Sequence, residues 1–180
     1  GRSLLVFAPS GTSVTARPAA VFIHGGGWGG GNPNLFFPHA RYYATRGLVG
    51  IAVGYRLAKD GGTGITPFDC VADVKSAIRY IRAHAVELGV DPHRIAVLGD
   101  SAGGHLAAAA ALLPGLDAAD DDVTVSPRPD ALVLYNPVLD TTGPDGWSLK
   151  VWGDAVVARA ADLSPADHVG PGAPPTLVIH

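Results

Sequence analysis

One serine in the chain has the neighbours expected of a nucleophile. Residues 99–103 read Gly-Asp-Ser-Ala-Gly, which fits the pattern Gly-x-Ser-x-Gly with Ser101 at its centre. In this pattern the serine occupies a sharp turn between a strand and a helix, and the flanking glycines leave room for a strained backbone. The turn would also place Ser101 at a helix N-terminus, where backbone N–H groups favour negative charge. These features favour acyl transfer to a serine hydroxyl.

A second pattern lies upstream, where residues 24–28 read His-Gly-Gly-Gly-Trp. Attack by Ser101 on a carbonyl carbon would leave negative charge on the carbonyl oxygen, and this oxygen needs hydrogen-bond donors. The backbone N–H of Ala102 is one candidate donor. Gly26 and Gly27 are the others, because glycine lets the backbone approach a substrate closely. The alternative is that residues 24–28 form an ordinary loop after a strand.

Both patterns follow apolar segments with the length and composition of buried strands. Strands are predicted at residues 4–8, 19–24, 48–55, 94–98, 131–135 and 176–179. Helices are predicted at residues 34–46, from residue 66 up to a glycine at residue 89, and at residues 102–113.

The helix boundaries depend on terminal signals in the sequence. Asn34 is predicted to cap the first helix, and Gly47 to follow it at the C′ position. Thr66 followed by Pro67 predicts the start of the second helix, and Gly89 predicts its end. The apolar face of that helix is predicted to consist of residues spaced by three and four positions, namely Val71, Val74, Ile78 and Ile81.

Strands that alternate with helices predict an α/β fold, in which helices cover both faces of a mostly parallel sheet. No linker or internal repeat divides the chain, so residues 1–180 are predicted to form one domain. Ligands of such sheets bind beyond the carboxyl ends of the strands. Residues 24–28 and Ser101 each follow a predicted strand directly, which supports a shared site.

The composition argues against several classes of function. The 180 residues carry a net charge of −3 without a basic cluster, so we expect no nucleic-acid partner. No apolar run is long enough to span a membrane, and no signal peptide is recognisable. Because the chain begins at Gly1 and contains no methionine, we expect it to be part of a longer product. The sequence favours no particular oligomeric state or compartment.

Two further groups of residues have simple structural interpretations. Cys70 is the only cysteine, and we expect a small core residue at the start of a buried helix rather than a catalytic thiol. An acidic run is expected to be a solvated loop after a helix; its members are Asp117, Asp120, Asp121 and Asp122.

The chain resembles the esterase and lipase group of the α/β-hydrolase fold that is related to hormone-sensitive lipase. The matching stretches are residues 24–28, 55–57, 90–95 and 99–106, and their order and spacing extend the resemblance from about residue 19 to residue 180. Residues 68–83 are similar to the small acetyl and feruloyl esterases that act on plant polysaccharides. The resemblance implies cleavage of short-chain acyl or acetyl esters of small molecules, including esters on carbohydrate. It implies no metal or organic cofactor.

The resemblance also implies a histidine base, oriented by an acid, in the chain order serine, acid, histidine. The acid would follow the strand at residues 176–179, so both partners are expected beyond His180 and the fold is expected to be incomplete at its C-terminus. His180 itself is expected to close that strand. Less favoured candidates are His168 as the base and Asp140, Asp145 and Asp154 as the acid.

Three polar residues near the two patterns are expected to have supporting roles. His105 is expected to be a packed, hydrogen-bonded core residue. His24 is expected to stabilise the glycine run, and Asp100 to hold the turn with its side chain directed away from Ser101.

Residues 140–171 are rich in Gly, Pro, Asp and Ala, with added apolar bulk from Trp147, Leu149, Val151 and Trp152. We expect a small lid or a wall of the acyl pocket; the alternative is a plain surface excursion with one helix. Two other functions also stay open: a non-catalytic hydrolase-like binding module or inactive fragment, and a peptidase on the same fold. An apolar strand at the sheet edge, residues 176–179, predicts poor solubility of the isolated chain.

Overall fold

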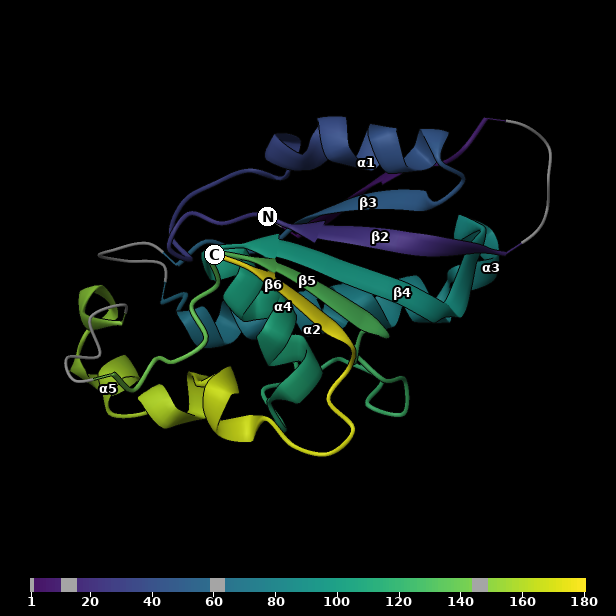
Figure 1. Ribbon diagram of the computed structural model, residues 1–180. Helices are drawn as coiled ribbons and strands as arrows, with labels where there is room; N and C mark the ends of the chain where they lie inside the picture. Colours follow the sequence, from purple (N-terminus) through teal and green to yellow (C-terminus); the bar gives the residue numbers. More distant parts are fainter. Residues whose placement is uncertain (1, 11–15, 59–63, 144–148) are drawn as a thin grey trace.

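The computed structural model describes residues 2–10, 16–58, 64–143 and 149–180. Its strands form one sheet in the order β1-β3-β2-β4-β5-β6, in which β1 runs antiparallel to β3 and the other neighbours are parallel (Figure 1). The strands are β1 (Ser3–Phe7), β2 (Arg17–Ile23), β3 (Val49–Gly54), β4 (Val90–Asp100), β5 (Ala131–Tyr135) and β6 (Thr176–Ile179). This architecture confirms the predicted α/β fold with a mostly parallel sheet.

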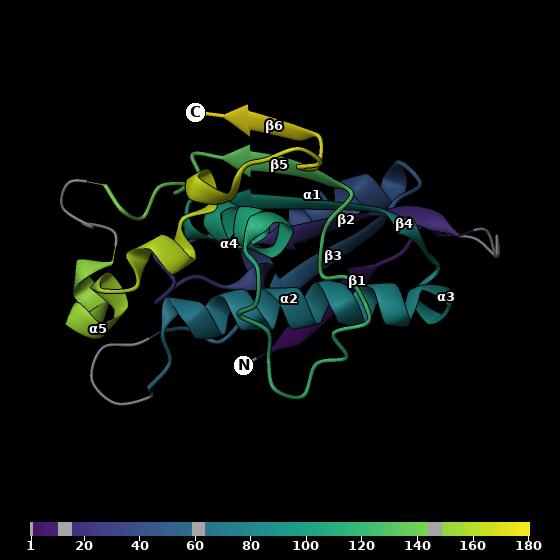
Figure 2. The same cartoon turned by 90° about the horizontal axis from the view of Figure 1, so that it is seen from below.

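Helices cover both faces of the sheet, as Figures 1 and 2 show. Helix α1 (Phe37–Thr45) packs on one face against β1, β2 and β3. Helices α2 (Pro67–Ala83), α3 (Ala85–Leu88) and α4 (Ala102–Leu112) lie on the opposite face. The central strands are buried because they are covered on both sides, and β3 is buried along its whole length.

Helix α2 begins where the sequence predicts. The carboxylate of Asp69 accepts hydrogen bonds from the backbone N–H and the hydroxyl of Thr66. These bonds connect the capping residue to the first turn of the helix. The four predicted core residues of α2 are fully buried: Val71, Val74, Ile78 and Ile81. The single helix predicted up to Gly89 is instead interrupted at His84, and Gly89 ends the short α3 with a φ of 67°.

Two other boundaries differ from the sequence prediction. Asn32, not Asn34, is the capping residue of this region: its side chain accepts from the Asn34 amide and precedes the short 3-10 helix η1 (Pro33–Phe36). Gly47 does follow α1, with a φ of 89°. Strand β4 is longer than predicted, because its first residue, Val90, already pairs with Arg17 of β2.

A segment at residues 149–168, here called the cover segment, follows β5 and packs on the α4 side of the sheet (Figure 2). It consists of short helices: η2 (Lys150–Trp152), α5 (Asp154–Val157), η3 (Ala160–Leu163) and η4 (Pro165–His168). Its residues Leu149, Val156 and Leu163 are buried in the main core. The cover segment thus contains several short helices and contributes buried residues to the core.

The acidic loop after α4 is anchored by cations of α2. Arg79 donates to the carboxylates of Asp117 and Asp121, each at 2.8 Å, and Lys75 Nζ donates to the carbonyl of Leu113 at 2.8 Å. The interpretation of the acidic run as a solvated loop is thus wrong for Asp117 and Asp121. It is correct for its other members, Asp120 and Asp122, which are exposed.

Over the residues that the structure describes, no helix is long and apolar enough for a membrane span. In the same residues, His, Cys, Asp and Glu do not cluster in threes in a way that could hold a metal ion.

Candidate active site

Ser101 occupies the sharp turn between β4 and α4. Its backbone has a φ of 50° and a ψ of −120°, a conformation that a residue with a side chain rarely adopts. The turn is held by a hydrogen bond of 2.9 Å from the Ser101 amide to the carbonyl of Tyr135, at the end of β5. A Cβ atom at Gly99 would overlap the carbonyl oxygen of Gly103, so this sharp return of the chain requires glycine.

The register of the sheet brings the two sequence patterns together. Strands β2 and β4 are neighbours, and Ile23 pairs with Gly99 at their carboxyl ends. Gly25 and Ser101 each lie two residues beyond this pair. A Cβ atom at Gly103 would lie 2.6 Å from the carbonyl oxygen of His24, so the first turn of α4 lies against the end of β2. The glycine run and the serine turn are therefore adjacent.

Residues 24–31, here called the glycine loop, expose two residues with unusual backbone angles, Gly26 and Gly27. Gly26 and Gly27 have φ angles of 116° and 57°. The carbonyl of Gly26 accepts from the amides of Gly29 and Gly30, but the amides of Gly26 and Gly27 donate to no other residue in the described part of the chain. The amide of Ala102 is the first of α4, where a helix offers no internal acceptor.

His24 supports the glycine loop through contacts of its buried ring. Its ring stacks on Tyr55 with a centroid distance of 4.4 Å, and its Nδ1 donates to the carbonyl of Gly25 at 2.8 Å. The hydroxyl of Tyr55 donates to the carbonyl of His24 at 2.8 Å. Burial lowers the pKa of His24, so the ring stays neutral near pH 7. The predicted supporting role of His24 is confirmed by these contacts.

Asp100 links the serine turn to the glycine loop. Its Oδ1 accepts a hydrogen bond of 2.7 Å from the amide of Gly25. This contact bonds the residue before Ser101 to the glycine loop, while the direction of its side chain away from Ser101 stays a prediction. A hollow of about 500 Å³ on the α1 face of the sheet also reaches Asp100 and Tyr135, and aromatic residues of α1 line its far side.

A contact between Trp28 and His105 was not predicted from the sequence. Trp28, the last residue of the His-Gly-Gly-Gly-Trp pattern, donates its indole N–H to Nδ1 of His105 at 3.1 Å. His105 in turn donates from Nε2 to the carbonyl of Leu163 in the cover segment, at 2.7 Å. His105 is fully buried and hydrogen-bonded, as predicted for a core residue. The helix period predicts its burial but carries no information about these partners.

None of the candidate partners that the structure describes contacts the Ser101 hydroxyl, which makes no hydrogen bond to any described residue. His168 and His180 are exposed, in η4 and after β6. Asp140 is exposed and accepts from the amide and hydroxyl of Thr142, and Asp154 is exposed in the first turn of α5. Asp145 lies outside the described residues.

Cys70 is a buried residue of α2, as expected. Its thiol lies 3.2 Å from the carbonyl of Arg56, and burial raises its pKa to about 12. The thiol therefore stays protonated and is a poor nucleophile.

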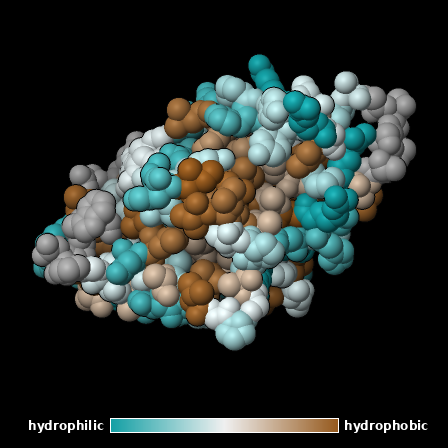
Figure 3. Space-filling view, viewed as in Figure 1, coloured by the Kyte–Doolittle hydropathy of each residue, from teal (hydrophilic) through white to brown (hydrophobic). Residues whose placement is uncertain are grey.

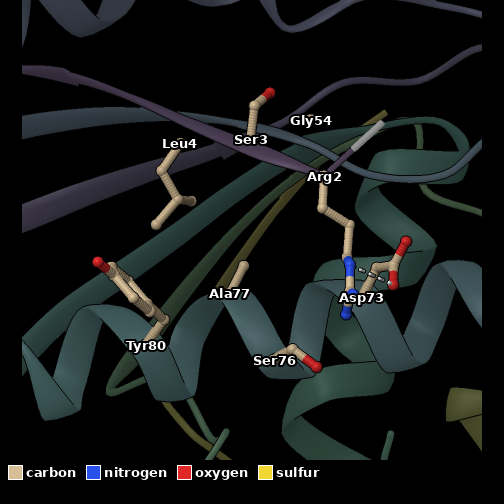
Figure 4. Close-up of a pocket in the computed structure, with 8 residues that line it drawn as sticks. All are labelled: Arg2, Ser3, Leu4, Gly54, Asp73, Ser76, Ala77 and Tyr80. Atoms are coloured by element: carbon tan, nitrogen blue, oxygen red, sulfur yellow. Dashed lines mark ion pairs between the residues drawn. The ribbon is translucent and has the colours of Figure 1, made fainter.

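A separate pocket of about 390 Å³ lies at the β1 edge of the sheet, between β1 and α2 (Figure 4). Figure 4 shows Arg2 directed at Asp73, with the Arg2 Nε 3.9 Å from the carboxylate. Asp73 is itself buried and bound by Arg56 through both carboxylate oxygens. The lining of this pocket includes neither Ser101 nor any residue of the glycine loop.

The chain was compared with known protein families. Residues 4–155 match the model of the family described as BD-FAE. The chain belongs to the BD-FAE family. Within this BD-FAE chain, the matched region contains the glycine loop, the serine turn and His105.

Individual relatives of this BD-FAE chain are named as an ester hydrolase, a deacetylase and an esterase. It is 31% identical over 177 residues to a probable carboxylic ester hydrolase, LipM, of Mycobacterium tuberculosis, covering 91% of this chain and 40% of LipM. It is 36% identical over 147 residues to arylacetamide deacetylase of Oryctolagus cuniculus, covering 78% of this chain and 34% of that protein. Esterase 2 of Thermogutta terrifontis, in a structure phosphoramylated by tabun, superposes with a TM-score of 0.87 at 40% identity. This match covers 98% of this chain and 65% of that one. The BD-FAE chain thus spans less than two thirds of each of these three proteins.

Proposed function

We propose that the protein is a serine hydrolase that cleaves carboxylic esters. In this proposal Ser101 attacks the ester carbonyl, and the amides of Gly26, Gly27 and Ala102 stabilise the resulting oxyanion. The observation that carries the proposal is the pairing of Ile23 with Gly99, which brings the strained serine turn beside the glycine loop. In that loop the amides of Gly26 and Gly27 have no described acceptor. Donors held in advance around a developing negative charge are a large source of catalysis in acyl transfer.

The proposal includes a histidine base and an acid that are contributed by a part of the protein outside these 180 residues. Two observations support this: the Ser101 hydroxyl has no described hydrogen-bond partner, and the chain spans 65% of the length of the Thermogutta esterase chain. Without a base a serine hydroxyl is a weak nucleophile. We therefore expect the 180 residues alone to retain only the small residual catalysis that donors and binding provide.

Short-chain acyl groups are the proposed substrates. Thermogutta terrifontis esterase 2 has been solved with propionate and with butyrate bound, and its sequence is about 39% identical to this chain. The cover segment supports the same assignment, because the Trp152 ring packs against Gly29 of the glycine loop. We propose that the cover segment forms a lid or wall over the acyl group. A small-molecule ester is thus the expected partner.

The test compares hydrolysis of p-nitrophenyl acetate, butyrate and octanoate by the 180-residue chain and by the protein expressed with the sequence that follows in its gene. We expect turnover of the two shorter esters by the longer protein only. Ser101→Ala should abolish this turnover, and it should also abolish labelling by paraoxon. Ser3→Ala, which changes a serine of the pocket in Figure 4, is the matched control and should leave both unchanged.

The other outcomes identify which part of the proposal is wrong. Turnover by the 180 residues alone that depends on Ser101 would show that the base lies within them. If neither form shows turnover that depends on Ser101, the protein is not an esterase and a non-catalytic binding module becomes the better description. Cleavage of amides or peptides in preference to esters would favour a peptidase on this fold.

A further inference from the structure

A continuous line of hydrogen bonds connects the glycine loop to the cover segment through one buried histidine. It runs from the indole N–H of Trp28 to Nδ1 of His105, and from Nε2 of His105 to the carbonyl of Leu163. The indole and imidazole rings also meet edge to face, with a centroid distance of 5.2 Å and an interplanar angle of 84°. Trp28 is 3% exposed and His105 is 0% exposed, so solvent does not compete for these bonds.

The two partners of His105 fix its tautomer. An indole N–H can only donate, and a peptide carbonyl can only accept. His105 must therefore accept at Nδ1 and donate from Nε2, which is possible only for the neutral ring with its proton on Nε2. An imidazolium would present a second N–H toward the indole N–H and would break the connection. Each ring nitrogen of His105 thus has one hydrogen-bond partner: the Trp28 indole at Nδ1 and the Leu163 carbonyl at Nε2.

Trp28 has an unfavourable backbone conformation that needs support from its surroundings. Its φ is 61°, in the left-handed region that residues with bulky side chains rarely occupy. Such a conformation costs on the order of 1–3 kcal/mol and persists only where neighbours hold it. The Trp28 carbonyl accepts from the amide of Ala58 at 2.9 Å, and its side chain is held by His105. Because Trp28 directly follows Gly27, holding Trp28 holds the peptide that joins the two residues and so anchors the C-terminal end of the glycine run.

The cover segment contacts the glycine loop at a second point. A Cβ atom at Gly29 would lie 2.7 Å from the tip of the Trp152 ring, so the ring lies against the backbone of this glycine. The cover segment is also bonded to the body of the domain. The amide of Ala166 donates to the carbonyl of Leu139 at 3.0 Å, and the Thr141 hydroxyl donates to the carbonyl of Ala160 at 2.7 Å.

We propose that His105 is a positioning residue that makes the placement of the Gly26 and Gly27 amides depend on how the cover segment is seated. With Leu163 in place, His105 is oriented to hold Trp28, and Trp28 holds the two glycines. A change in the cover segment would then alter the rate of the acyl-transfer step without any contact to the reacting atoms. This inference rests on the proposed function, since it assigns a role to the same site.

Two substitutions at His105 separate the two bonds. The side-chain amide of asparagine reaches about as far as Nδ1 of histidine. In the His105→Asn variant it can still accept from the Trp28 indole N–H, but the hydrogen bond to the Leu163 carbonyl is lost. The side-chain amide of glutamine reaches about as far as Nε2 of histidine. In the His105→Gln variant it can still donate to the Leu163 carbonyl, but the hydrogen bond from the Trp28 indole N–H is lost. We expect each to lower kcat of the catalytically competent protein by roughly 10- to 100-fold with KM little changed, because small misplacements at a reacting centre are costly. Full activity of His105→Asn would overturn the connection to the cover segment.

The effect of the same variants on the glycine loop can also be measured without an ester substrate. In the 180-residue chain, nuclear magnetic resonance of the amide groups of Gly26 and Gly27 and of the Trp28 indole should show shifts in both His105 variants. Ile78→Val, a mild change in the same core on α2, is the matched control and should leave these signals in place. Unmoved glycine amides in either His105 variant would contradict the inference.

The two measurements keep this inference separate from the proposed function. If Ser101→Ala fails to abolish turnover, the proposed function fails, while the resonance experiment still tests the connection. Trp28→Phe adds a double-mutant cycle, since it keeps the ring contact and removes the donor. We expect Trp28→Phe and His105→Gln together to cost no more in kcat than either alone, because both remove the same bond. Additive losses in kcat would contradict the inference that Trp28 and His105 act through the same hydrogen bond.

Discussion

The amide of Gly25 donates to the Oδ1 of Asp100 at 2.7 Å, so the glycine loop is bonded to the residue that precedes the proposed nucleophile. A Cβ atom at Gly25 would lie 2.7 Å from the other carboxylate oxygen, which shows how closely the two backbones approach. The relative position of the two halves of the site is therefore set by a specific bond as well as by sheet pairing.

Removing this bond should destabilise the protein. Asp100→Ala leaves the Gly25 amide without its acceptor, and we expect a loss of about 1–3 kcal/mol in the free energy of unfolding. Asp100→Asn keeps an oxygen at the same position and should cost less. Urea denaturation monitored by fluorescence measures both values. Equal losses for the two variants would argue against the bond as the cause.

Gly26 and Gly27 should differ in their tolerance of alanine. A Cβ atom at Gly26 would lie 2.5 Å from the backbone of Gly30, whereas a Cβ atom at Gly27 would meet no atom within 4 Å. Gly27→Ala should therefore cost only the left-handed strain, on the order of 1–2 kcal/mol. Gly26→Ala should displace the loop and abolish ester turnover. Thermal unfolding and turnover of the two variants test this order, and a fully active Gly26→Ala protein would contradict it.

Acid should destabilise the chain through its buried histidines. Burial lowers the pKa of His105 from 6.5 to about 4, and also lowers the pKa of His24. The unfolded chain therefore binds protons below pH 6.5 that the folded chain does not bind until about pH 4. Stability is expected to fall as pH falls through this window, by at most about 3 kcal/mol for His105, and to be fully present above pH 6.5. Denaturation of His105→Asn between pH 7 and 4.5 should show a shallower loss than the unmodified chain.

Two arginines should differ in their contribution to stability. Arg79 is 8% exposed and pairs with both Asp117 and Asp121, whereas Arg159 and its partner Asp162 are both more than half exposed. Arg79→Met should cost about 3 kcal/mol, because it removes the described cation partner of Asp121 and leaves Asp117 with Lys75 alone. Arg159→Met should cost less than about 1 kcal/mol. Similar losses for the two variants would mean that the α2 anchor is not important for the fold.

The outer strand β6 should promote self-association of the 180-residue chain. It is the last strand of the sheet, and its residues Leu177, Val178 and Ile179 are 43–55% exposed. Figure 3 shows hydrophobic side chains gathered over this part of the surface. An apolar sheet edge is a template for further pairing. Sedimentation should show oligomers that Leu177→Lys reduces, and a monodisperse monomer at high concentration would contradict the expectation.

The sequence predicts the fold well wherever a local pattern decides the structure. The apolar strands, the start of α2 at Thr66 and the turn at Ser101 depend on neighbours within a few residues. The cap predicted at Asn34 is wrong; Pro33 directly after Asn32 is the local signal for a helix start at that position. The single helix predicted up to Gly89 was too long, since α2 ends before His84.

What the sequence could not predict depends on residues distant in the chain. The pairing of Arg79 with Asp117 and Asp121 spans 38 and 42 residues, so the acidic run looked like a free loop. The bond between Trp28 and His105 spans 77 residues. The roles of Ser101, Gly26, Gly27 and Ala102 stay predictions, to be tested by the substitutions described above.

The bond between Gly25 and Asp100 has a consequence for the order of folding. Its partners are 75 residues apart, and the intervening chain forms β3, α2 and α3 before β4 can align beside β2. Closing so long a loop is entropically costly until the crossover has packed, and contacts of this kind form late. We expect the strained turn at Ser101 to assemble in the last stage of folding. A chain still emerging from the ribosome would then contain the serine but not the geometry that makes it reactive.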